Sequence, residues 1–562
     1  GDWSSDVCSS DLAVATITVN DAGDVVANNG KCTLREAIIA ANTNIASGAA
    51  AGECAAGTPG TDQIVFALGT GTPSIAPTSP LPTITESINI VGNSGGATRV
   101  ELNGVNAGAG ANGLTITAGN SALSRLVINR FSGDGISLQG SGFSSIKGCL
   151  IGTDAAGLAR RANGVGVALR GSSDNVIGGT ALGERNVVSG NTGVGILLTP
   201  TDSPFVAAAR NSIVNNYIGL DVNGREDLGN GGFGIDSFGG DNAVIGGATT
   251  AERNIISGND GGGIRLKAFN AANPGGGNHI KGNYIGTGPN GFDPLGNGIA
   301  GGGGIAPGIL IFGSSNNTVG GLTTSESNVI RSNNQNGGIV VYQEVIVNGM
   351  IITVIPANGN KLLGNSMYGN TGLAIDLNGD GVTANDSSFP AVDTDDGPNH
   401  LQNFPVILLA VGNSTSTTIS GGLQSTPSRL FRIEFFLSPQ CDGSGAGEGQ
   451  ILLGTTNVFT DALGAATFSK TFNDIPLPRG QAVTATATLL DTFSNPVETS
   501  EFSPCYLIPA SGGGSGCTAS LNPPQQTVKA PGGTVTVGVN VESGCDWTAS
   551  GNVAWANIQC GS

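Results

Sequence analysis

Four side chains in the middle of the sequence have the types and spacing that acid–base chemistry on a polymer requires. They are Asp236 and Phe238 in Gly-Ile-Asp-Ser-Phe, and Arg265 and Lys267 in Gly-Ile-Arg-Leu-Lys. Alternate residues of a strand share a face, so aligning the two segments pairs the acid with one base and the ring with the other. A polysaccharide lyase needs a base and a cation, and an inverting glycoside hydrolase needs two acids ~6.5–9.5 Å apart. Asp236, Arg265 and Lys267 are therefore candidate catalytic residues, and the alternative is a solvated face with one salt bridge.

The Gly-Ile pattern recurs along the chain and extends this alignment into two columns of outward side chains. In chain order the columns are Ser137, Ala168, Leu197, Asp236, Arg265, Leu310, Val340 and Asp376, and Gln139, Arg170, Thr199, Phe238, Lys267, Phe312, Tyr342 and Asn378. An aromatic ring offers a flat apolar face against which a sugar ring can pack. We therefore predict that Phe238, Phe312 and Tyr342 contact a glycan.

These columns require an element that stacks short strands, and the sequence contains a repeat of that kind. The phrase Ile-Gly occurs at Ile151, Ile218 and Ile285, and both intervals are 67 residues (218 − 151 and 285 − 218). A second phrase ends in Gly-Gly at Gly179 and Gly247, 68 residues apart (247 − 179), and returns once more further along. Self-similarity at such periods indicates a solenoid.

Glycine is the unusual component of the composition, with 94 of 562 residues, about 17% against a usual ~7%. Glycine and asparagine tolerate the left-handed backbone of tight corners, and asparagine side chains can hydrogen-bond from one rung to the next. Helical patterns are absent between residues 100 and 375. The sequence thus predicts an all-β protein with a parallel β-helix over residues 99–402 and β-sandwich modules after it. A β-propeller is the alternative, but its units of ~40–45 residues are regular, whereas the Gly-Ile spacings here are not.

A short amphipathic helix is expected near residue 33, where it would cover the open end of the stack. Thr33 and Glu36 form a capping box, and a disulfide between Cys32 and Cys54 would staple this region. The run Cys-Thr-Leu-Arg-Glu-Ala-Ile from Cys32 resembles the CSLREAI region that precedes many bacterial right-handed parallel β-helices. The resemblance covers roughly residues 13–98, and Gln402-Asn403-Phe404-Pro405 resembles the ending of the same family. It implies that residues 13–98 are the cap and that the β-helix is right-handed.

The pattern changes after residue 402 to longer alternating strands. This pattern is typical of an immunoglobulin-like sandwich over residues 403–508, in which Cys441 and Cys505 are a plausible disulfide pair. The run Pro-Ala-Ser-Gly-Gly-Gly-Ser-Gly at 509–516 is a flexible linker.

The last segment, residues 517–562, resembles part of a BACON domain, a sandwich often attached to bacterial carbohydrate-active proteins. The resemblance rests on Gly-Cys-Asp-Trp-Thr-Ala from Gly544 and on the later Trp555. Cys517 and Cys545 are further disulfide candidates. Trp547 and Trp555 are candidate glycan-binding residues, and packing in the core is the alternative.

An acidic loop closes the predicted β-helix. Asp376, Asn378 and Asp380 are spaced like the first oxygen ligands of a calcium loop, and Gly381 permits the turn. The closing glutamate is missing, because Ser387 stands at its position, so Asp386 is taken as the fourth ligand. Asp393 or Asp395 could also fold back onto the ion, and a solvated turn without an ion is the alternative.

The charge balance excludes two classes of partner. With 23 basic and 41 acidic residues, the net charge of −18 repels nucleic acid and anionic lipid. No apolar run approaches the ~18 residues of a membrane-spanning helix.

The first residues and the cysteines bear on where the protein acts. Residues 2–12 resemble a translated sequencing adapter, so we expect residues 1–12 to be an artefact. Without Cys8 the 9 cysteines become an even number, which fits disulfides in an extracellular location. Cys149 and Cys560 have no predicted partner.

These patterns favour a secreted or cell-surface protein that acts as a scaffold or adhesin and binds glycans. The alternative is a polysaccharide lyase or glycoside hydrolase on the same fold, since fold alone does not decide activity. The sequence leans against an enzyme because it contains no dense acid–base cluster. Calcium is the one cofactor expected, and the oligomeric state is not predicted.

Overall fold

The computed structural model describes residues 14–299, 304–348, 351–386, 393, 395–412, 415–473, 480–508, 519–522 and 538–541. The chain divides into two compact units. The first unit runs to Asn336 and includes Gln343–Ala357, and the second contains Gly337–Tyr342 and the chain from Asn358 onward.

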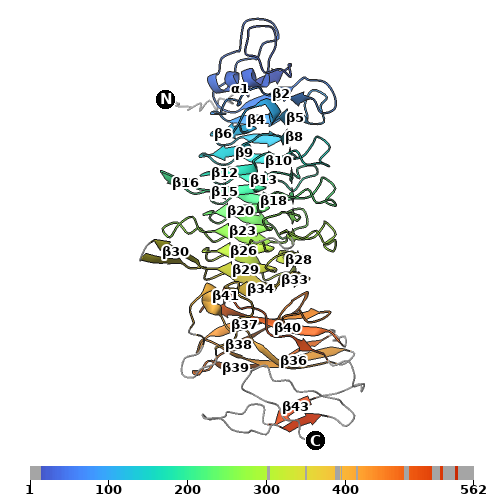
Figure 1. Cartoon of the computed structure of the whole chain (residues 1–562), viewed down its shortest axis with the longest axis vertical. Coiled ribbons are helices and arrows are strands. Elements are labelled where there is room, and N and C mark those ends of the chain that lie inside the picture. Colours follow the sequence, from blue (N-terminus) through green and yellow to red (C-terminus); the bar gives the residue numbers. More distant parts are fainter. Residues whose placement is uncertain are drawn as a thin grey trace, which may run out of the picture. The chain divides into compact units, whose positions relative to one another are not determined.

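Three parallel sheets wind around a common core in the first unit (Figure 1). Sheet 1 consists, in spatial order, of β1 (Thr16–Val19), β2 (Asp62–Phe66), β4 (Ile88–Val91), β7 (Ala122–Ser124), β10 (Ser145–Lys147), β13 (Val176–Gly178), β18 (Ser212–Val214), β21 (Val244–Gly246), β24 (His279–Lys281) and β27 (Thr318–Gly320). Sheet 2 consists of β3 (Ser74–Ile75), β5 (Val100–Asn103), β8 (Leu126–Asn129), β11 (Leu150–Ile151), β14 (Val187–Val188), β19 (Tyr217–Ile218), β22 (Ile255–Ile256), β25 (Tyr284–Ile285) and β28 (Val329–Arg331). Sheet 3 consists of β6 (Leu114–Ile116), β9 (Asp134–Gln139), β12 (Val165–Arg170), β15 (Ile196–Thr199), β20 (Ile235–Phe238), β23 (Ile264–Lys267) and β26 (Ile309–Phe312).

The core is a stack of aliphatic side chains, because successive strand residues point alternately inward and outward. In sheet 3 the inward positions are Leu114, Ile136, Val167, Ile196, Ile235, Ile264 and Ile309, and each is at most 1% exposed. Consecutive turns pair in parallel, as Ile235 does with Ile264. The predicted parallel β-helix is confirmed, and this pairing is incompatible with the antiparallel blades of a propeller.

The corners between strands carry the glycine and asparagine that the composition emphasised. Gly178 has a φ of 97°, and a Cβ there would lie 1.8 Å from the carbonyl oxygen of Val214, so only glycine fits. Buried asparagines form ladders in which each Nδ2 donates to the Oδ1 of the asparagine on the next turn, at 2.8–3.1 Å. The members of one ladder are Asn163, Asn191, Asn230, Asn259, Asn297 and Asn333.

The helix α1 (Leu34–Thr43) lies at the start of the stack, and its buried residues include Leu34, Ala37, Ile38 and Ala41. The capping box between Thr33 and Glu36 is present, and the disulfide between Cys32 and Cys54 is formed. Parallel pairing already begins between β1 and β2, on either side of α1. Two 3₁₀ turns, η1 (Gly104–Asn106) and η2 (Thr324–Glu326), complete the helical elements of this unit.

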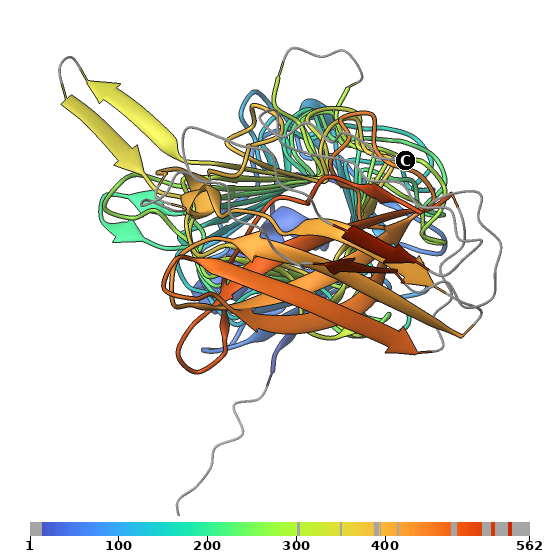
Figure 2. The ribbon, with the colours of Figure 1, turned by 90° about the horizontal axis from the view of Figure 1, so that it is seen from below.

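Two antiparallel hairpins leave the turns of the first unit. One joins β16 (Thr201–Asp202) to β17 (Phe205–Val206), and the other joins β30 (Glu344–Asn348) to β31 (Ile351–Ile355). Figure 2 shows the second hairpin, in yellow, extending well away from the neighbouring strands. Both follow strands of the Gly-Ile type, where inserted residues do not disturb the stacked core.

The second unit combines the final strands of β-helix type with a sandwich. Those final strands are β29 (Ile339–Tyr342), β32 (Lys361–Leu363), β33 (Ser366–Tyr368) and β34 (Ile375–Leu377), followed by η3 (Pro398–Leu401). The sandwich has one sheet of β35 (Val406–Gly412), β36 (Ser416–Gln424) and β39 (Ala465–Asn473), and another of β37 (Leu430–Ser438), β38 (Ile451–Phe459), β40 (Ala482–Leu490), β41 (Pro496–Thr499) and β42 (Tyr506–Leu507). Both sheets bury residues in one core, including Ile419, Phe431, Phe435 and Phe468.

The sandwich confirms one predicted disulfide, and the remaining cysteines are single or undescribed. Cys441 and Cys505 are bonded. Cys149 is a buried free thiol, and burial raises its pKa to about 11. Cys8, Cys517, Cys545 and Cys560 lie outside the described residues. The segment beyond the linker contributes β43 (Ala519–Asn522) and β44 (Gly538–Val541), which pair antiparallel.

In the part of the chain that the structure describes, no helix has the length and apolar character needed to cross a membrane.

Candidate functional site

The predicted columns of outward side chains exist on sheet 3. Asp236 pairs in register with Arg265, and Phe238 pairs with Lys267. On the next turn Lys267 lies beside Phe312. The Gly-Ile alignment therefore places acid, bases and rings on one face, as the sequence predicts.

Asp236 and Arg265 form a bidentate ion pair. The Nε of Arg265 donates to Oδ1 of Asp236 at 2.8 Å, and the Nη2 donates to Oδ2 at 2.5 Å. The side chain of Asp236 is only 5% exposed, and the guanidinium lies over the ring of Phe233 at 4.9 Å. Because both carboxylate oxygens are bound, Asp236 can accept a proton from a substrate only if this pair opens.

Lys267 lies between two aromatic rings and one carboxylate. Its Nζ is 5.4 Å from the ring centre of Phe238 and 5.3 Å from that of Phe312. It also forms an ion pair with Glu344 of the hairpin strand β30, at 3.2 Å. The ammonium is therefore held in place by cation–π and ionic contacts, while 28% of the side chain stays exposed.

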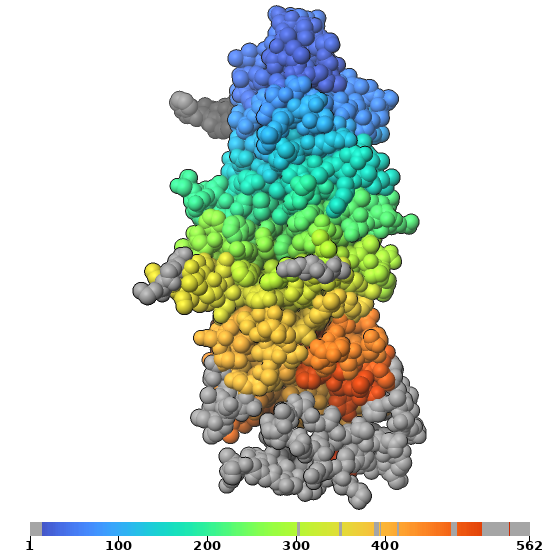
Figure 3. All heavy atoms as spheres, in the orientation of Figure 1, coloured from blue at the N-terminus to red at the C-terminus, as the bar shows by residue number. Residues whose placement is uncertain are grey.

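Two further phenylalanines continue this surface toward the other hairpin. The ring of Phe238 meets that of Phe269 edge-on at 5.4 Å, and Phe269 lies 5.9 Å from Phe205 of β17. Phe205 is 38% exposed. We call Phe205, Phe269, Phe238, Lys267 and Phe312 the aromatic strip. In Figure 3 the two hairpins that contribute Phe205 and Glu344 stand out at the left of the surface, in green and yellow.

The sequence pattern missed part of this surface. Phe269 follows Lys267 by two residues and so continues the outward alternation, a signal that could have identified it. Glu344 likewise follows the predicted outward residue Tyr342 by two, so the same signal could have identified it. Phe205 comes from an inserted hairpin, and nothing in the strand pattern indicates where that hairpin lies.

The other predicted glycan-binding residues are Tyr342, Trp547 and Trp555. Tyr342 belongs to the second unit, where its hydroxyl donates to the carbonyl of Gly379 at 3.2 Å. Burial, with the charges of Asp376 and Asp380, raises the pKa of this tyrosine. Trp547 and Trp555 lie outside the described residues.

Hydrogen bonds within the predicted calcium loop engage two of its side chains. Asn378 donates its Nδ2 to Oδ2 of Asp380 at 2.9 Å, and Oδ1 of Asp376 is buried without a hydrogen-bond partner. Asp376 is 8% exposed and accepts the N–H of Gly381 at 3.3 Å on Oδ2. Burial, and secondarily the charge of Asp380, raises the pKa of Asp376 to about 6.

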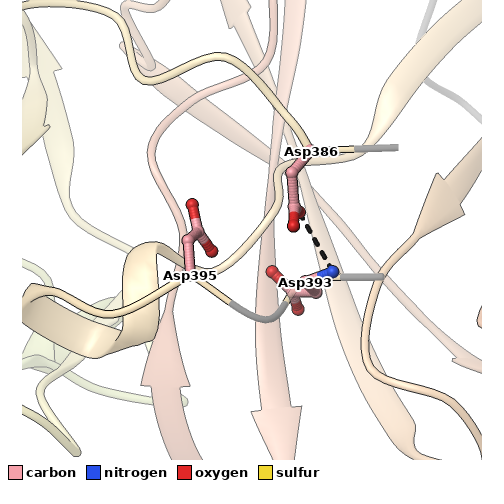
Figure 4. Close-up of side chains that lie close together, drawn as sticks. All are labelled: Asp386, Asp393 and Asp395. Carbon is pink, nitrogen blue, oxygen red and sulfur yellow. Dashed lines mark hydrogen bonds between the residues drawn. The ribbon is translucent and has the colours of Figure 1, made fainter. Parts of the chain in front are cut away.

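Asp386 instead lies with Asp393 and Asp395, whose carboxylate oxygens come within 4.8 Å of one another (Figure 4). The N–H of Asp393 donates to Asp386 at 3.0 Å. Oδ1 of Asp395 is buried and has no hydrogen-bond partner. Burial and the neighbouring aspartate charges raise the pKa of Asp395. Oxygen ligands gathered in this way suit Ca²⁺, and they include one oxygen that lacks any other partner.

Comparisons with known proteins add little to this geometry. No protein-family model matches the chain, and no curated protein matches it. The Dettilon tailspike protein gp208 is a similar solved structure, with 16% identity, a TM-score of 0.28, and coverage of 74% of this chain and 88% of that one. The alginate lyase from Paenibacillus sp. str. FPU-7 has 17% identity, a TM-score of 0.26, and coverage of 64% and 99%. TM-scores this low carry no argument about what the present chain does.

Proposed function

We propose that this protein acts outside the cell, as a surface scaffold or adhesin, and binds glycan chains along the aromatic strip of sheet 3. The observation that carries the proposal is the unbroken contact from Phe205 through Phe269, Phe238 and Lys267 to Phe312, at 5.3–5.9 Å per step. Successive rings can pack against successive sugar units, and the ammonium can donate to hydroxyl or carboxylate oxygens. The two disulfides suit an oxidising compartment.

Binding without cleavage is the function that the site supports best. A lyase or hydrolase acting here would use Asp236, yet Arg265 occupies both of its oxygens. Glu344, a second carboxylate at the strip, is engaged by Lys267. The strip thus offers rings and a fixed cation, which are groups that hold a sugar chain.

A glycan array with the full chain tests the proposal. We expect retention of a subset of polysaccharides, and at least ~10-fold weaker retention by the Phe238→Ala, Phe312→Ala double variant, since losing ~1.4 kcal/mol of apolar burial from two rings lowers the affinity tenfold. Phe292→Ala is the matched control, because Phe292 is 68% exposed and lies outside the strip. Equal retention by the double variant, or no retained glycan at all, would refute the proposal.

Product analysis on the retained polysaccharides separates binding from turnover. We expect neither new reducing ends nor unsaturated products during prolonged incubation. Products that vanish in Asp236→Asn would establish the lyase or hydrolase alternative instead.

A further inference from the structure

A pocket of about 490 Å³ lies against the outward face of sheet 2 in the first unit. Its floor includes Leu150 of β11 and Val187 of β14, which pair in register. Their neighbours Ile151 and Val188 point into the core, so Leu150 and Val187 face the other way. Val222 and Leu182 contribute to its walls, and both are exposed. The volume falls within the ~300–1,000 Å³ of small-molecule sites.

Two arginines line the pocket, and a third lies against one of its lining residues. Arg99 and Arg185 line the pocket, and the guanidinium of Arg125 lies against the lining residue Gly183, where a Cβ would be 2.1 Å from Nη2. Arg99 donates from Nη2 to the carbonyl of Gly148 at 3.1 Å, but its Nε is buried without a partner.

Nearby acids balance the positive charge at this pocket only in part: hydrogen bonding to Lys147, and secondarily the charge of Arg125, lowers the pKa of Glu184. Among the described residues, none of the three arginines forms an ion pair, and the adjacent Glu184 is already bound by Lys147 at 3.0 Å. Burial, and secondarily the charge of Arg125, lowers the pKa of Arg99. On a chain of net charge −18 this is a local concentration of cations, which attracts anions.

Arg185 has a structural partner that the next repeat reproduces. Its guanidinium lies over Tyr217 at 4.2 Å, and Arg253 lies over Tyr284 at 4.0 Å. Arg185 is therefore part of the recurring wall, whereas Arg99 and Arg125 are additional cations. The donor that is buried without a partner, Nε of Arg99, belongs to one of these two additional arginines.

We propose that the pocket binds the carboxylate of an acidic sugar, so that the ligand is a uronate unit of a glycan. The guanidinium groups of Arg99 and Arg125 match a carboxylate in charge and in fork geometry. Leu182 and Val222, the exposed wall residues, pack against the C–H face of the ring. This inference rests on the proposed glycan binding and adds to it a second site, on a different sheet, with a defined charge.

Calorimetric titration of the full chain with D-glucuronate tests the pocket, with D-glucose and sodium sulfate as comparison ligands. We expect saturable binding of glucuronate and no binding of glucose. In Arg99→Gln and in Arg125→Gln, we expect the affinity for glucuronate to fall at least ~10-fold. Arg161→Gln is the control, because Arg161 is exposed and does not line the pocket. Ala181→Trp fills the exposed rim of the pocket, and we expect it to abolish binding in a protein of unchanged melting temperature.

The outcomes of this titration separate the two proposals. Wild-type affinity in both arginine variants, no saturable glucuronate binding, or equally strong sulfate binding overturns the uronate pocket. If the Phe238→Ala, Phe312→Ala variant loses glycan retention while the arginine variants keep it, that result supports binding at the aromatic strip and refutes the uronate pocket. If the protein binds glucuronate but retains no glycan at the strip, the proposed function is refuted and the uronate pocket is supported.

Discussion

Glu501 of the sandwich segment accepts a hydrogen bond from the backbone N–H of Leu377 in β34 at 2.8 Å. It is one of several glutamates that satisfy backbone donors at the last strands of β-helix type within the second unit. The other pairs are Glu434 with Gly364, Glu498 with Gly359, and Glu448 with Asn370, at 2.8–3.2 Å. A strand edge otherwise leaves its N–H groups unpaired, so carboxylates here complete the sheet edge.

The stability of the second unit is expected to fall as pH rises from about 5 to 8. Burial, and secondarily the charge of Asp376, raises the pKa of Glu501 to about 8, against ~4.3 in an unfolded chain. Between these two pKa values the folded state therefore holds a proton that the unfolded state releases. The contribution of Glu501 to the free energy of unfolding is fully present below pH ~4.3 and is lost as the pH rises through about 8. The loss amounts to at most ~1.4 kcal/mol per pH unit for this group. Thr383 donates from Oγ1 to Oε1 of Glu501 at 3.2 Å and from its backbone N–H to Oε2 at 2.9 Å.

Calorimetric melting across this pH range measures the effect. Glu501→Gln cannot ionise, so its pH slope should be flatter even though the amide also changes the baseline stability. Asp491→Asn is the control, because Asp491 is only partly buried and hydrogen bonding to Asn495 lowers its pKa. The prediction is contradicted if the wild type becomes more stable between pH 5 and 8 and Glu501→Gln does not.

Calcium is predicted to bind at Asp386, Asp393 and Asp395 and to raise the melting temperature of the second unit. The cation would offset the mutual repulsion of three carboxylates that lie within 4.8 Å. At a concentration 100 times the dissociation constant, binding adds ~2.7 kcal/mol to the free energy of unfolding. Thermal melting with and without Ca²⁺ should show the shift in the wild type and in Asp380→Asn, but not in Asp395→Asn. A shift that Asp380→Asn abolishes and Asp395→Asn keeps would place the ion in the loop that the sequence pattern indicated.

The asparagine ladder should make a large contribution to the stability of the first unit. Asn230 is fully buried, donates to Val188 at 2.9 Å and to Asn259 at 2.8 Å, and accepts from Asn191. Asn230→Ala leaves several buried groups unpaired, and each costs ~1–3 kcal/mol. Urea unfolding should therefore show a loss of at least ~2 kcal/mol. Asn93→Ala, in an exposed turn, should change stability by less than ~0.5 kcal/mol, and equal effects of both variants would refute the role of the ladder.

The fold could be predicted because its determinants are local and repeated. Gly-Ile phrases set the strand register, so the pairing of Asp236 with Arg265 followed from alignment alone. The capping box of Thr33 and Glu36 lies within four residues and needs no distant contact.

Other contacts depend on segments that no local pattern relates. Glu501 and Leu377 are 124 residues apart, and nothing near either residue indicates the other. Glu344, the first residue of the hairpin strand β30, forms its ion pair with Lys267 of β23, a strand far earlier in the chain. Asp386 likewise gathers with Asp393 and Asp395 because backbone and side-chain bonds of Asn403 hold the loop.

The pair of Asp236 and Arg265 is predicted to be a structural ion pair whose two members act as a unit. Removing one partner leaves the other charge partly buried and unpaired, which costs ~3–5 kcal/mol for a buried pair. Asp236→Ala and Arg265→Ala should each destabilise the first unit in urea unfolding, and the double variant should lose less than the sum of the two. A coupling energy of at least ~1 kcal/mol is expected, as found for residues in direct contact. If the losses simply add, or if Asp236→Ala costs nothing, the carboxylate is free of its partner in solution and the catalytic assignment of Asp236 regains its basis.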